Sequence, residues 1–264
     1  MSDMQKVWIT GASSGIGLAC SLRYASRGAQ LVMTALPGEE LSSAAERCRA
    51  AGAARVETLP YDFSDPSGLS ALCEAAWACF DGLDVVYCNA GISQRTLVED
   101  TSEEMVRKIM EIDFFAPETI ARTVLPRMLA QGGGHIAVTS SISGKFGFPL
   151  RSAYSAAKFA LYGFFETLQA EYYHRGIRVT IVCPGRVQTN ISLSALDKGG
   201  KPHGQMDPGQ AGGITADRAA RIIVKAIDRG RREVLVGSKE LLMVYVKRFF
   251  PGLCARLSRR IKPQ

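Results

Sequence analysis

The sequence predicts a single α/β domain: a doubly wound, seven-stranded parallel sheet with helices on both faces. Short apolar runs alternate along the chain with longer segments of helical periodicity, and parallel strands need such crossover helices. A glycine-rich turn separates the first apolar run from the first helical segment. The chain has 264 residues, which is enough for one large domain with a substantial core.

The apolar runs give the expected strands in chain order. They read VWIT, QLVMT, RVETL, DVVYC, HIAVT, RVTIVC and EVLVG. We expect the first strand at 7–10, a helix at 16–27, and two long helices at 117–131 and 152–174. The catalytic body is expected to span 1–237 and to include a Gly-rich and polar lid at 186–214. A basic tail follows at 238–264.

The glycine-rich turn reads TGASSGIG and contains Gly11, Gly15 and Gly17. Glycines permit unusual φ values, let the backbone approach a pyrophosphate, and let a helix pack closely on a strand. An ordinary strand-to-helix turn is the alternative, but the strand before it and the helix after it favour a dinucleotide site on a Rossmann-like sheet. Ser13, Ser14 and Ile16 would share that site.

Tyr154 and Lys158 lie four residues apart in YSAAK, and Ser141 precedes the tyrosine by thirteen residues. Residues four apart on a helix lie on one face, and a nearby ammonium stabilises a phenolate. Tyr154 is therefore a candidate proton donor and acceptor, and the Ser141 hydroxyl can polarise a carbonyl oxygen. Each residue alone could be structural, so the hypothesis depends on their combination.

Together these motifs resemble the short-chain dehydrogenase/reductase family. The resemblance covers residues 6 to about 236 and includes the glycine turn, an Asn-Ala-Gly triplet, the Ser, Tyr and Lys, and a Pro-Gly pair. It implies NAD(P)-dependent interconversion of a carbonyl and a secondary alcohol. It also implies that Lys158 and Tyr154 contact the cofactor, together with Asp62, Asn89, Ala90, Gly91, Pro184, Gly185, Val187 and Thr189. Asp62 could instead be a helix cap or a solvated loop acid.

One position departs from the family pattern, because Asp113 stands in EIDFFAP where asparagine is usual. In the family this residue helps hold a water chain that leads to the lysine. Either the Asp113 side chain or its backbone carbonyl could do this here, and a carboxylate near Lys158 would favour the charged lysine. Asp113 therefore joins Ser141, Tyr154 and Lys158 as a candidate catalytic residue.

The end of the second strand indicates which cofactor is used. An acid there binds the 2′-hydroxyl of NAD, whereas a basic residue accommodates the 2′-phosphate of NADP. Ala35 occupies the position of the acid and Leu36 follows it. Since nothing in this stretch repels a phosphate, we expect NADP rather than NAD.

Composition narrows the setting. The seven cysteines form no C-x-x-C pair and, with the three histidines, show no metal spacing, so we expect no metal. The cysteine usage, the immediate start of the first strand and the lack of a long apolar stretch favour a cytoplasmic protein without a signal or an N-terminal anchor. The net charge of +7 lies mostly in residues 238–264, which carry seven basic residues and one acid, so nucleic-acid binding is not expected.

The lid and the tail suggest an apolar substrate. With RSAYSAAK and the closing FFPGL, the lid resembles a branch of the family containing membrane-bound mammalian enzymes associated with reduction of acyl- or alkyl-dihydroxyacetone phosphate. The sequence places Arg95 and Arg151 near this region, where they could meet an anionic headgroup or remain solvated. The apolar residues expected to wall a lipid- or steroid-like pocket are Phe146, Phe148, Pro149 and Leu150.

The tail has apolar residues near helical spacing with basic residues between them, and Pro251 with Gly252 should divide it into two short helices. It can lie on an anionic membrane or pack on the body. The expected apolar face is Leu242, Tyr245, Val246, Phe249, Leu253, Leu257 and Ile261.

Two other functions are possible on the same fold. One is a non-catalytic dinucleotide sensor and the other is a membrane-surface scaffold. Retention of both Tyr154 and Lys158 favours the enzyme. By analogy with the family, the two long helices are expected to form a homodimer or homotetramer.

Overall fold

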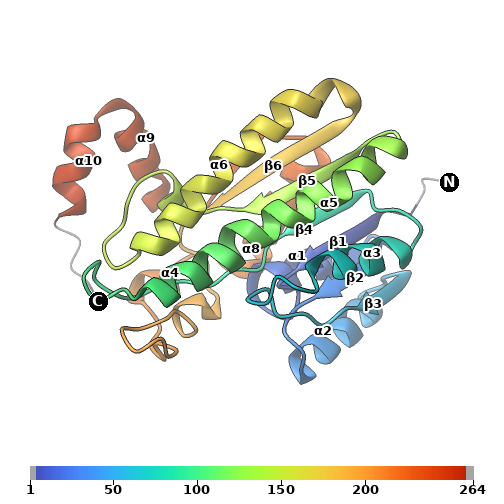
Figure 1. Ribbon diagram of the computed structural model, residues 1–264, viewed down its shortest axis with the longest axis horizontal. Coiled ribbons are helices and arrows are strands. Elements are labelled where there is room, and N and C mark those ends of the chain that lie inside the picture. The colour runs from blue at the N-terminus through green and yellow to red at the C-terminus, as the bar shows by residue number, and fades with distance from the viewer. Residues whose placement is uncertain (1–3, 260–264) are drawn as a thin grey trace.

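The computed structural model describes residues 4–259, so Arg260, Ile261 and Lys262 lie outside the described part. Seven parallel strands form one sheet in the order β3-β2-β1-β4-β5-β6-β7, which confirms the predicted fold class (Figure 1). The strands are β1 (Lys6–Thr10), β2 (Gln30–Thr34), β3 (Arg55–Thr58), β4 (Val85–Cys88), β5 (Gly134–Thr139), β6 (Ile177–Pro184) and β7 (Glu233–Val236).

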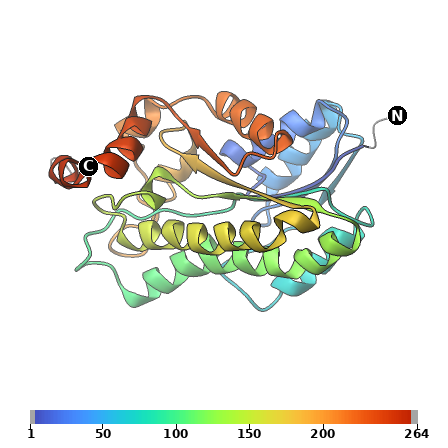
Figure 2. The same cartoon turned by 90° about the horizontal axis from the view of Figure 1, so that it is seen from above.

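Helices cover both faces of the sheet (Figure 2). One hydrophobic cluster joins the sheet to α1 (Gly15–Ala25), α2 (Glu39–Ala50) and α8 (Ala216–Asp228). A second cluster on the opposite face includes α3 (Leu69–Ala78), α5 (Ala116–Ala130) and α6 (Ser152–Tyr172). Strands buried on both faces need apolar side chains throughout, which is why they appear in the sequence as continuous runs.

The order of the strands reverses direction between β1 and β4, and this places the candidate site. The chain runs outward from β1 through β2 and β3, then returns to β4 on the other side of β1. The loops after β1 and β4 therefore diverge at the carboxyl edge and leave a crevice there, where ligands bind in open α/β sheets.

A π-helical turn interrupts the long helical segment beside the sheet. It spans Glu111–Phe115 and joins α4 (Glu103–Met110) to α5. Such a turn inserts one extra residue and shifts the side chains that follow, often at functional sites. Here it contains the fully buried Asp113.

The lid forms little regular structure, whereas the tail is helical. A 3₁₀ turn at Asn190–Ser192 and the short α7 (Pro208–Ala211) lie in the lid. The tail contains α9 (Leu242–Phe249) and α10 (Pro251–Ser258), which confirms the predicted break. Both stand at one end of the molecule, away from the N-terminus (Figure 1). None of the helices in residues 4–259 is long and apolar enough to cross a membrane.

Candidate active site

A cavity of about 1180 Å³ lies at the carboxyl ends of the central strands. It runs from the glycine turn and the end of β2, past the ends of β4, β5 and β6, to the lid. Two predicted residues, Gly17 and Asp113, do not line it. The predicted residues that do line it are Gly11, Ser13, Ser14, Gly15, Ile16, Asp62, Asn89, Ala90, Gly91, Ser141, Tyr154, Lys158, Pro184, Gly185, Val187 and Thr189.

The glycine turn has the backbone that its sequence predicts. Gly11 and Gly15 have φ values of +64° and +54°, which side chains rarely permit. Gly17 is required by packing, because a Cβ there would lie 2.1 Å from the Gly11 carbonyl oxygen. Asn89 fastens the turn to β4 by donating from Nδ2 to the carbonyl oxygens of Thr10, at 3.2 Å, and Gly11, at 3.4 Å.

The structure brings the Ser, Tyr and Lys of the motif together at one cavity. All three are buried against the cavity. Ser141 caps a 3₁₀ turn, since its Oγ accepts the Ser143 amide at 3.1 Å. The Lys158 Nζ donates to the Thr139 carbonyl oxygen at 2.9 Å and lies 5.7 Å from the Tyr154 ring centroid.

Asp113 contacts Lys158 from behind the cavity wall. Its Oδ2 is 3.3 Å from the Lys158 Nζ, and its Oδ1 accepts the Ile92 amide at 2.8 Å. Burial raises the pKa of Asp113, while the Lys158 charge opposes that shift. Gly91 leaves room for the pair, because a Cβ there would lie 3.2 Å from Oδ1 and 3.3 Å from Nζ. The carboxylate itself, rather than only its backbone, therefore faces the lysine.

Gln94 is a positioning residue that sequence reasoning missed. The N-cap of α6, Arg151, makes no side-chain cap. Instead the Gln94 Oε1 accepts the amides of Ala153, at 2.9 Å, and Tyr154, at 3.3 Å. Its Nε2 lies within hydrogen-bond distance of three hydroxyl oxygens, those of Thr96, Thr101 and Ser152. No local pattern announces this cap, because the two ends are sixty residues apart.

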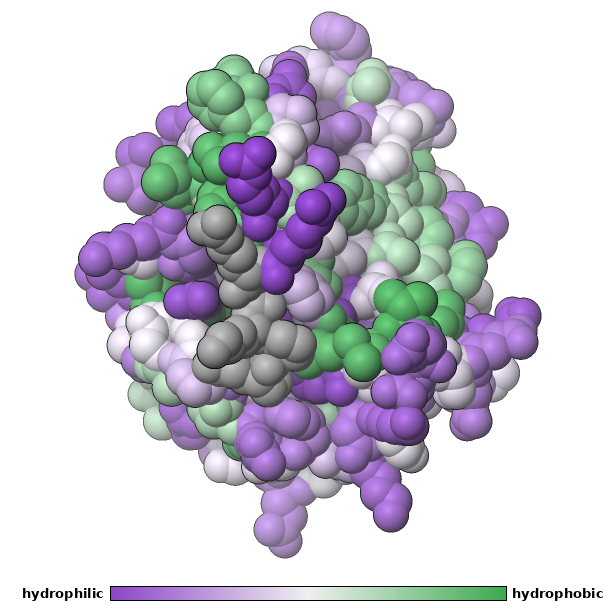
Figure 3. All heavy atoms as spheres, turned by 90° about the vertical axis from the view of Figure 1, so that its left-hand side faces the viewer, coloured by the Kyte–Doolittle hydropathy of each residue, from purple (hydrophilic) through white to green (hydrophobic). Residues whose placement is uncertain are grey.

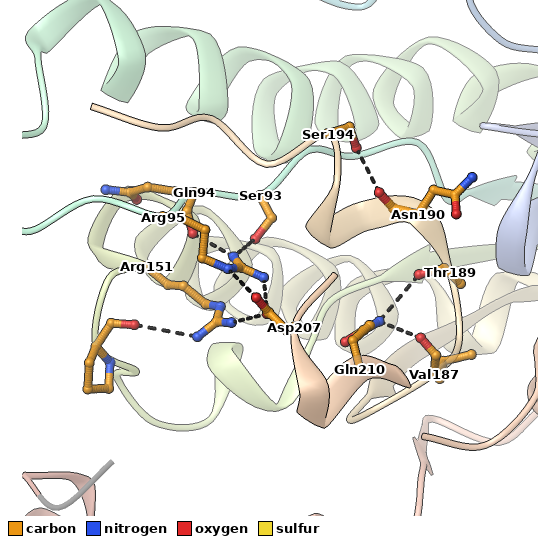
Figure 4. A network of polar contacts seen from close by, with 11 residues as sticks. Ser93, Gln94, Arg95, Arg151, Val187, Thr189, Asn190, Ser194, Asp207 and Gln210 are labelled. Atoms are coloured by element: carbon orange, nitrogen blue, oxygen red, sulfur yellow. Dashed lines mark hydrogen bonds and ion pairs between the residues drawn. The ribbon is translucent and has the colours of Figure 1, made fainter. Parts of the chain in front are cut away.

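The lid is fastened to the body by Asp207, another residue that the sequence did not single out (Figure 4). Its carboxylate binds Arg95 through Oδ2, at 2.5 Å, and Oδ1, at 3.2 Å. Oδ2 also accepts from Arg151 at 2.9 Å. Arg95 and Arg151 are thus neither free for a headgroup nor solvated. Burial lowers the pKa of Arg151 to about 10. Burial by itself would raise the pKa of Asp207, but the hydrogen bond and the positive charge of Arg95 outweigh it, so the pKa of Asp207 is lowered.

Two further contacts hold the lid. The Gln210 Nε2 donates to the Val187 carbonyl oxygen and lies 3.3 Å from the Thr189 hydroxyl (Figure 4). Backbone bonds of 2.8 Å join Arg95 to the Leu196 carbonyl and Leu196 to the Ser93 carbonyl. The lid therefore packs directly on the loop after β4.

The expected apolar wall is only partly correct. Phe148, Pro149 and Leu150 line the cavity. Phe146 does not: it is buried in a separate cluster with Cys183 and Cys254, under the tail. The Phe148 ring packs against the same cluster, 6.0 Å from the Phe146 ring between centroids, and it also lines the cavity, whereas Phe146 lies too deep to do so.

The far end of the cavity is formed by Ala35, Leu36 and the first turn of α2, including Glu39 and Glu40. Asp62 also lines this end, and its Oδ1 accepts the amide and the hydroxyl of Ser64. Asp62 is therefore a loop-capping acid that also faces the cavity.

The residues present fit a dinucleotide. The cavity is long, a glycine turn with free amides opens a helix at one end, and the buried Ser141, Tyr154 and Lys158 lie at the other. Within residues 4–259 no group of three or more His, Cys, Asp or Glu side chains could hold a metal ion.

The family comparison agrees with this geometry. Residues 5–198 match the family model for short chain dehydrogenases. Dehydrogenase/reductase SDR family member 7B of Bos taurus is 35% identical over 95% of this chain and 79% of the relative. A Drosophila melanogaster protein called dehydrogenase/reductase SDR family protein 7-like is 31% identical, over 92% of this chain and 75% of the relative.

Solved structures show the same architecture. A short chain dehydrogenase/reductase from Burkholderia phymatum, in complex with NAD, has a TM-score of 0.84 at 24% identity and covers 99% of this chain and 97% of its own. A short-chain dehydrogenase from Sphingobium yanoikuyae, in complex with NADPH, has a TM-score of 0.79 at 26% identity, covering 98% and 97%. With its motifs in order, its fold matched and most of its length aligned, this chain belongs to the short-chain dehydrogenase/reductase family of oxidoreductases.

Proposed function

We propose that this oxidoreductase interconverts a carbonyl and a secondary alcohol on an apolar, lipid- or steroid-like substrate. The observation that carries the proposal is that Ser141, Tyr154 and Lys158 share one cavity with the glycine turn. A nicotinamide bound there would supply or accept the hydride. The side chains of the protein then need only bind the oxygen and move its proton.

Ser141 is suited to bind the substrate oxygen. Its Oγ already accepts the Ser143 amide, so its own hydrogen is available to donate to a carbonyl. Tyr154 supplies the proton during reduction and takes it during oxidation. Lys158 is held by the Thr139 carbonyl and Asp113, and its ammonium lies beside the Tyr154 ring, where negative charge develops as the proton is transferred.

The wall of the cavity near Tyr154 supports the proposed substrate class. Phe148, Pro149 and Leu150 contribute apolar surface to it, and the Arg95 and Arg151 charges are already paired with Asp207. An uncharged ketone or alcohol therefore meets complementary surface, whereas an anion would have to displace a carboxylate.

We propose NADP as the cofactor. Ala35 presents no carboxylate to the 2′-phosphate, and no side chain caps the N-terminus of α2, where backbone amides can receive it. Glu39 and Glu40 line the same end and oppose the phosphate. The preference over NAD should accordingly be modest, about tenfold or less.

The test is NADPH oxidation with a panel of hydrophobic ketones. Tyr154→Phe removes the proton donor and should lower kcat about 10²–10⁴-fold. Lys158→Met should lower activity and weaken NADPH binding as well. Near-normal turnover by the phenylalanine variant would refute the mechanism. The alternative, a non-catalytic dinucleotide sensor, predicts that NADPH binds while no member of the panel is reduced.

We also propose a homodimer or homotetramer that uses the outer faces of α6 and of α5, together with the π-helical turn that leads into α5. Phe115 and Phe159 are large apolar side chains exposed there. Sedimentation velocity of wild type and Phe159→Ser tests this assembly: a monomer in both would contradict it.

A further inference from the structure

A second cleft, of about 870 Å³, lies between α8, β7 and α9, separate from the catalytic cavity. Its lining contains one acid, Glu233, which pairs with Lys145 at 2.8 Å. Apolar side chains such as Ile222, Leu235 and Val244 also contribute to its surface. The six basic side chains that line it are Lys145, Lys225, Arg229, Arg231, Lys247 and Arg248.

Among residues 4–259, five of these six charges have no counterion. In the described part of the chain, no carboxylate lies within 4 Å of the cationic groups of Lys225, Arg229, Arg231, Lys247 or Arg248. Like charges gathered around one hollow repel one another. Such a cleft is therefore complementary to an anion such as a phosphate group.

The helix that borders this cleft has two apolar faces. Met243, Val244 and Val246 pack inward on the cluster that contains Phe146 and Cys254. The other face points to solvent and carries Leu242, which is 65% exposed, Tyr245, 53% exposed, and Phe249, 68% exposed.

These side chains recur at spacings of three and four, so they form one stripe along α9. Phe250, which separates the two tail helices, and Leu253 of α10 are also exposed. Figure 3 faces this end of the molecule and shows hydrophobic side chains beside long hydrophilic ones. We call the stripe from Leu242 to Leu253 the tail ridge. A soluble surface rarely leaves an aromatic and aliphatic stripe uncovered beside a basic cleft.

We propose that the cleft and the tail ridge together dock on an anionic phospholipid bilayer. A lipid phosphate would bind among Arg229, Arg231 and Arg248, while the ridge enters the boundary between headgroups and acyl chains. The arrangement favours lipid over a second copy of this chain, because two basic clefts brought together would repel each other. Tyr245 lines the cleft and also belongs to the ridge, so both parts can engage one surface at once.

The docking surface is connected to the catalytic cavity. The inner face of α9 packs on a cluster that includes Phe148, and Phe148 lines that cavity. If the proposed apolar substrate is correct, attachment would hold the cavity close to the membrane in which such a substrate dissolves.

The experiment is co-sedimentation of the full chain with vesicles of phosphatidylcholine, alone or mixed with phosphatidylserine, at low and high salt. The cleft variant is Arg229→Gln, Arg231→Gln and Arg248→Gln combined. Its matched control neutralises Arg47, Arg107 and Arg122, which lie on α2, α4 and α5 and do not line the cleft. We expect wild type to bind only the anionic vesicles, and less at high salt. The cleft variant should bind on the order of a hundredfold more weakly, since each basic residue near an anionic surface contributes roughly a factor of five.

A second variant, Leu242→Ser with Phe249→Ser, tests the ridge and should also weaken binding, while the control variant should bind like wild type. Circular dichroism and turnover of a soluble ketone verify that each variant is folded. Equal binding by cleft and control variants would overturn the proposal, as would wild type that ignores anionic vesicles. Two further measurements identify a different occupant, and either result would overturn the proposal. Inorganic phosphate that binds the cleft, without any binding of vesicles, would indicate a site for a small anion. A molar mass by light scattering that changes in the ridge variant would indicate that the ridge binds a second copy of this chain.

Discussion

Replacing Asp207 by asparagine should release the lid. The carboxylate accepts from two guanidinium groups, and asparagine retains a single acceptor oxygen and adds an amide donor that faces them. The side chains of Arg95, Asp207 and Arg151 are 4%, 15% and 19% exposed. Water therefore cannot fully solvate the two guanidinium groups once the carboxylate charge is removed.

The magnitude follows from this burial. Removing one partner of a buried, hydrogen-bonded charge pair costs about 2–5 kcal/mol, largely because the other charge is left unpaired. Arg95 keeps its bonds to the Ser93 hydroxyl and the Gln94 carbonyl, which favours the lower half of that range. A loss of about 2–3 kcal/mol disfavours the closed lid by roughly 30- to 150-fold.

Two measurements check this prediction. The kcat/KM for a hydrophobic ketone should fall by a factor in that range, mostly through KM, and limited proteolysis should become faster in the glycine-containing stretch at 198–204. Asp207→Glu should restore part of the activity. The matched control is Asp217→Asn, since the Asp217 side chain is 68% exposed and pairs with its helix neighbour Arg221.

A kcat/KM within twofold of wild type, with an unchanged proteolysis rate, would refute the reasoning. A lower Tm with unchanged kcat/KM at 25 °C would mean that Asp207 stabilises the fold without governing the lid.

Three further predictions concern single residues. Asp113→Asn retains an acceptor for the Ile92 amide but removes the negative charge beside Lys158. The rate of alcohol oxidation, measured against pH, should then reach its plateau at lower pH. An unchanged pH profile would show that the carboxylate is only structural. Ala35→Asp should repel the 2′-phosphate and select NAD, measured as kcat/KM for both cofactors; a tenfold preference of wild type for NAD would contradict our NADP assignment. Burial lowers the pKa of His135 to about 4. As the pH falls, the unfolded chain therefore protonates this histidine before the folded chain does. The free energy of unfolding should fall by about 3 kcal/mol between about pH 6.5 and pH 4 for this reason. His135→Leu should lose that component in urea unfolding at the two pH values, and equal pH dependence in both proteins would exclude His135 as its source.

The parts of the site that the sequence predicts are those formed within one short segment. Gly11, Gly15 and Gly17 lie in one turn, and Tyr154 and Lys158 lie on one helix, so spacing alone determines their geometry. The strands could also be predicted from the sequence, because both faces of a parallel sheet are buried and each strand is therefore a continuous apolar run.

The parts that it did not predict depend on contacts between distant segments. Gln94 and Tyr154 are sixty residues apart, and Asp207 is more than a hundred residues from Arg95. We expected Arg95 to bind an anionic headgroup or to remain solvated, and its pairing with Asp207 shows that it does neither. The prediction for Phe146 was wrong for a related reason. Its ring lies 6.0 Å from that of Phe148 between centroids, yet Phe148 lines the cavity and Phe146 is buried under the tail, and proximity in sequence does not decide this.

Several of the contacts that hold the site converge on one stretch, residues 91–95. Gly91 gives space to the Asp113–Lys158 pair, and the Ile92 amide binds Asp113 in the π-helical turn. Gln94 caps the helix that carries Tyr154, and Arg95 fastens the lid. Because Asn89 and Ala90 immediately before this stretch are bonded to β1 at the glycine turn, the same loop joins the expected cofactor site, the proton-transferring residues and the lid.

This convergence explains how Asp113 can occupy the position of the usual asparagine. The π-helical turn and Gly91 together admit a carboxylate to the wall behind Lys158, where its second oxygen faces the ammonium and its first keeps the backbone bond to Ile92. A carboxylate buried there without the lysine would be strongly disfavoured, and the lysine without it would rely on the Thr139 carbonyl alone. Asp113 and Lys158 therefore act as one unit, an ion pair whose geometry is set by the loop after β4. Substitutions at either residue should be interpreted as changes to that unit.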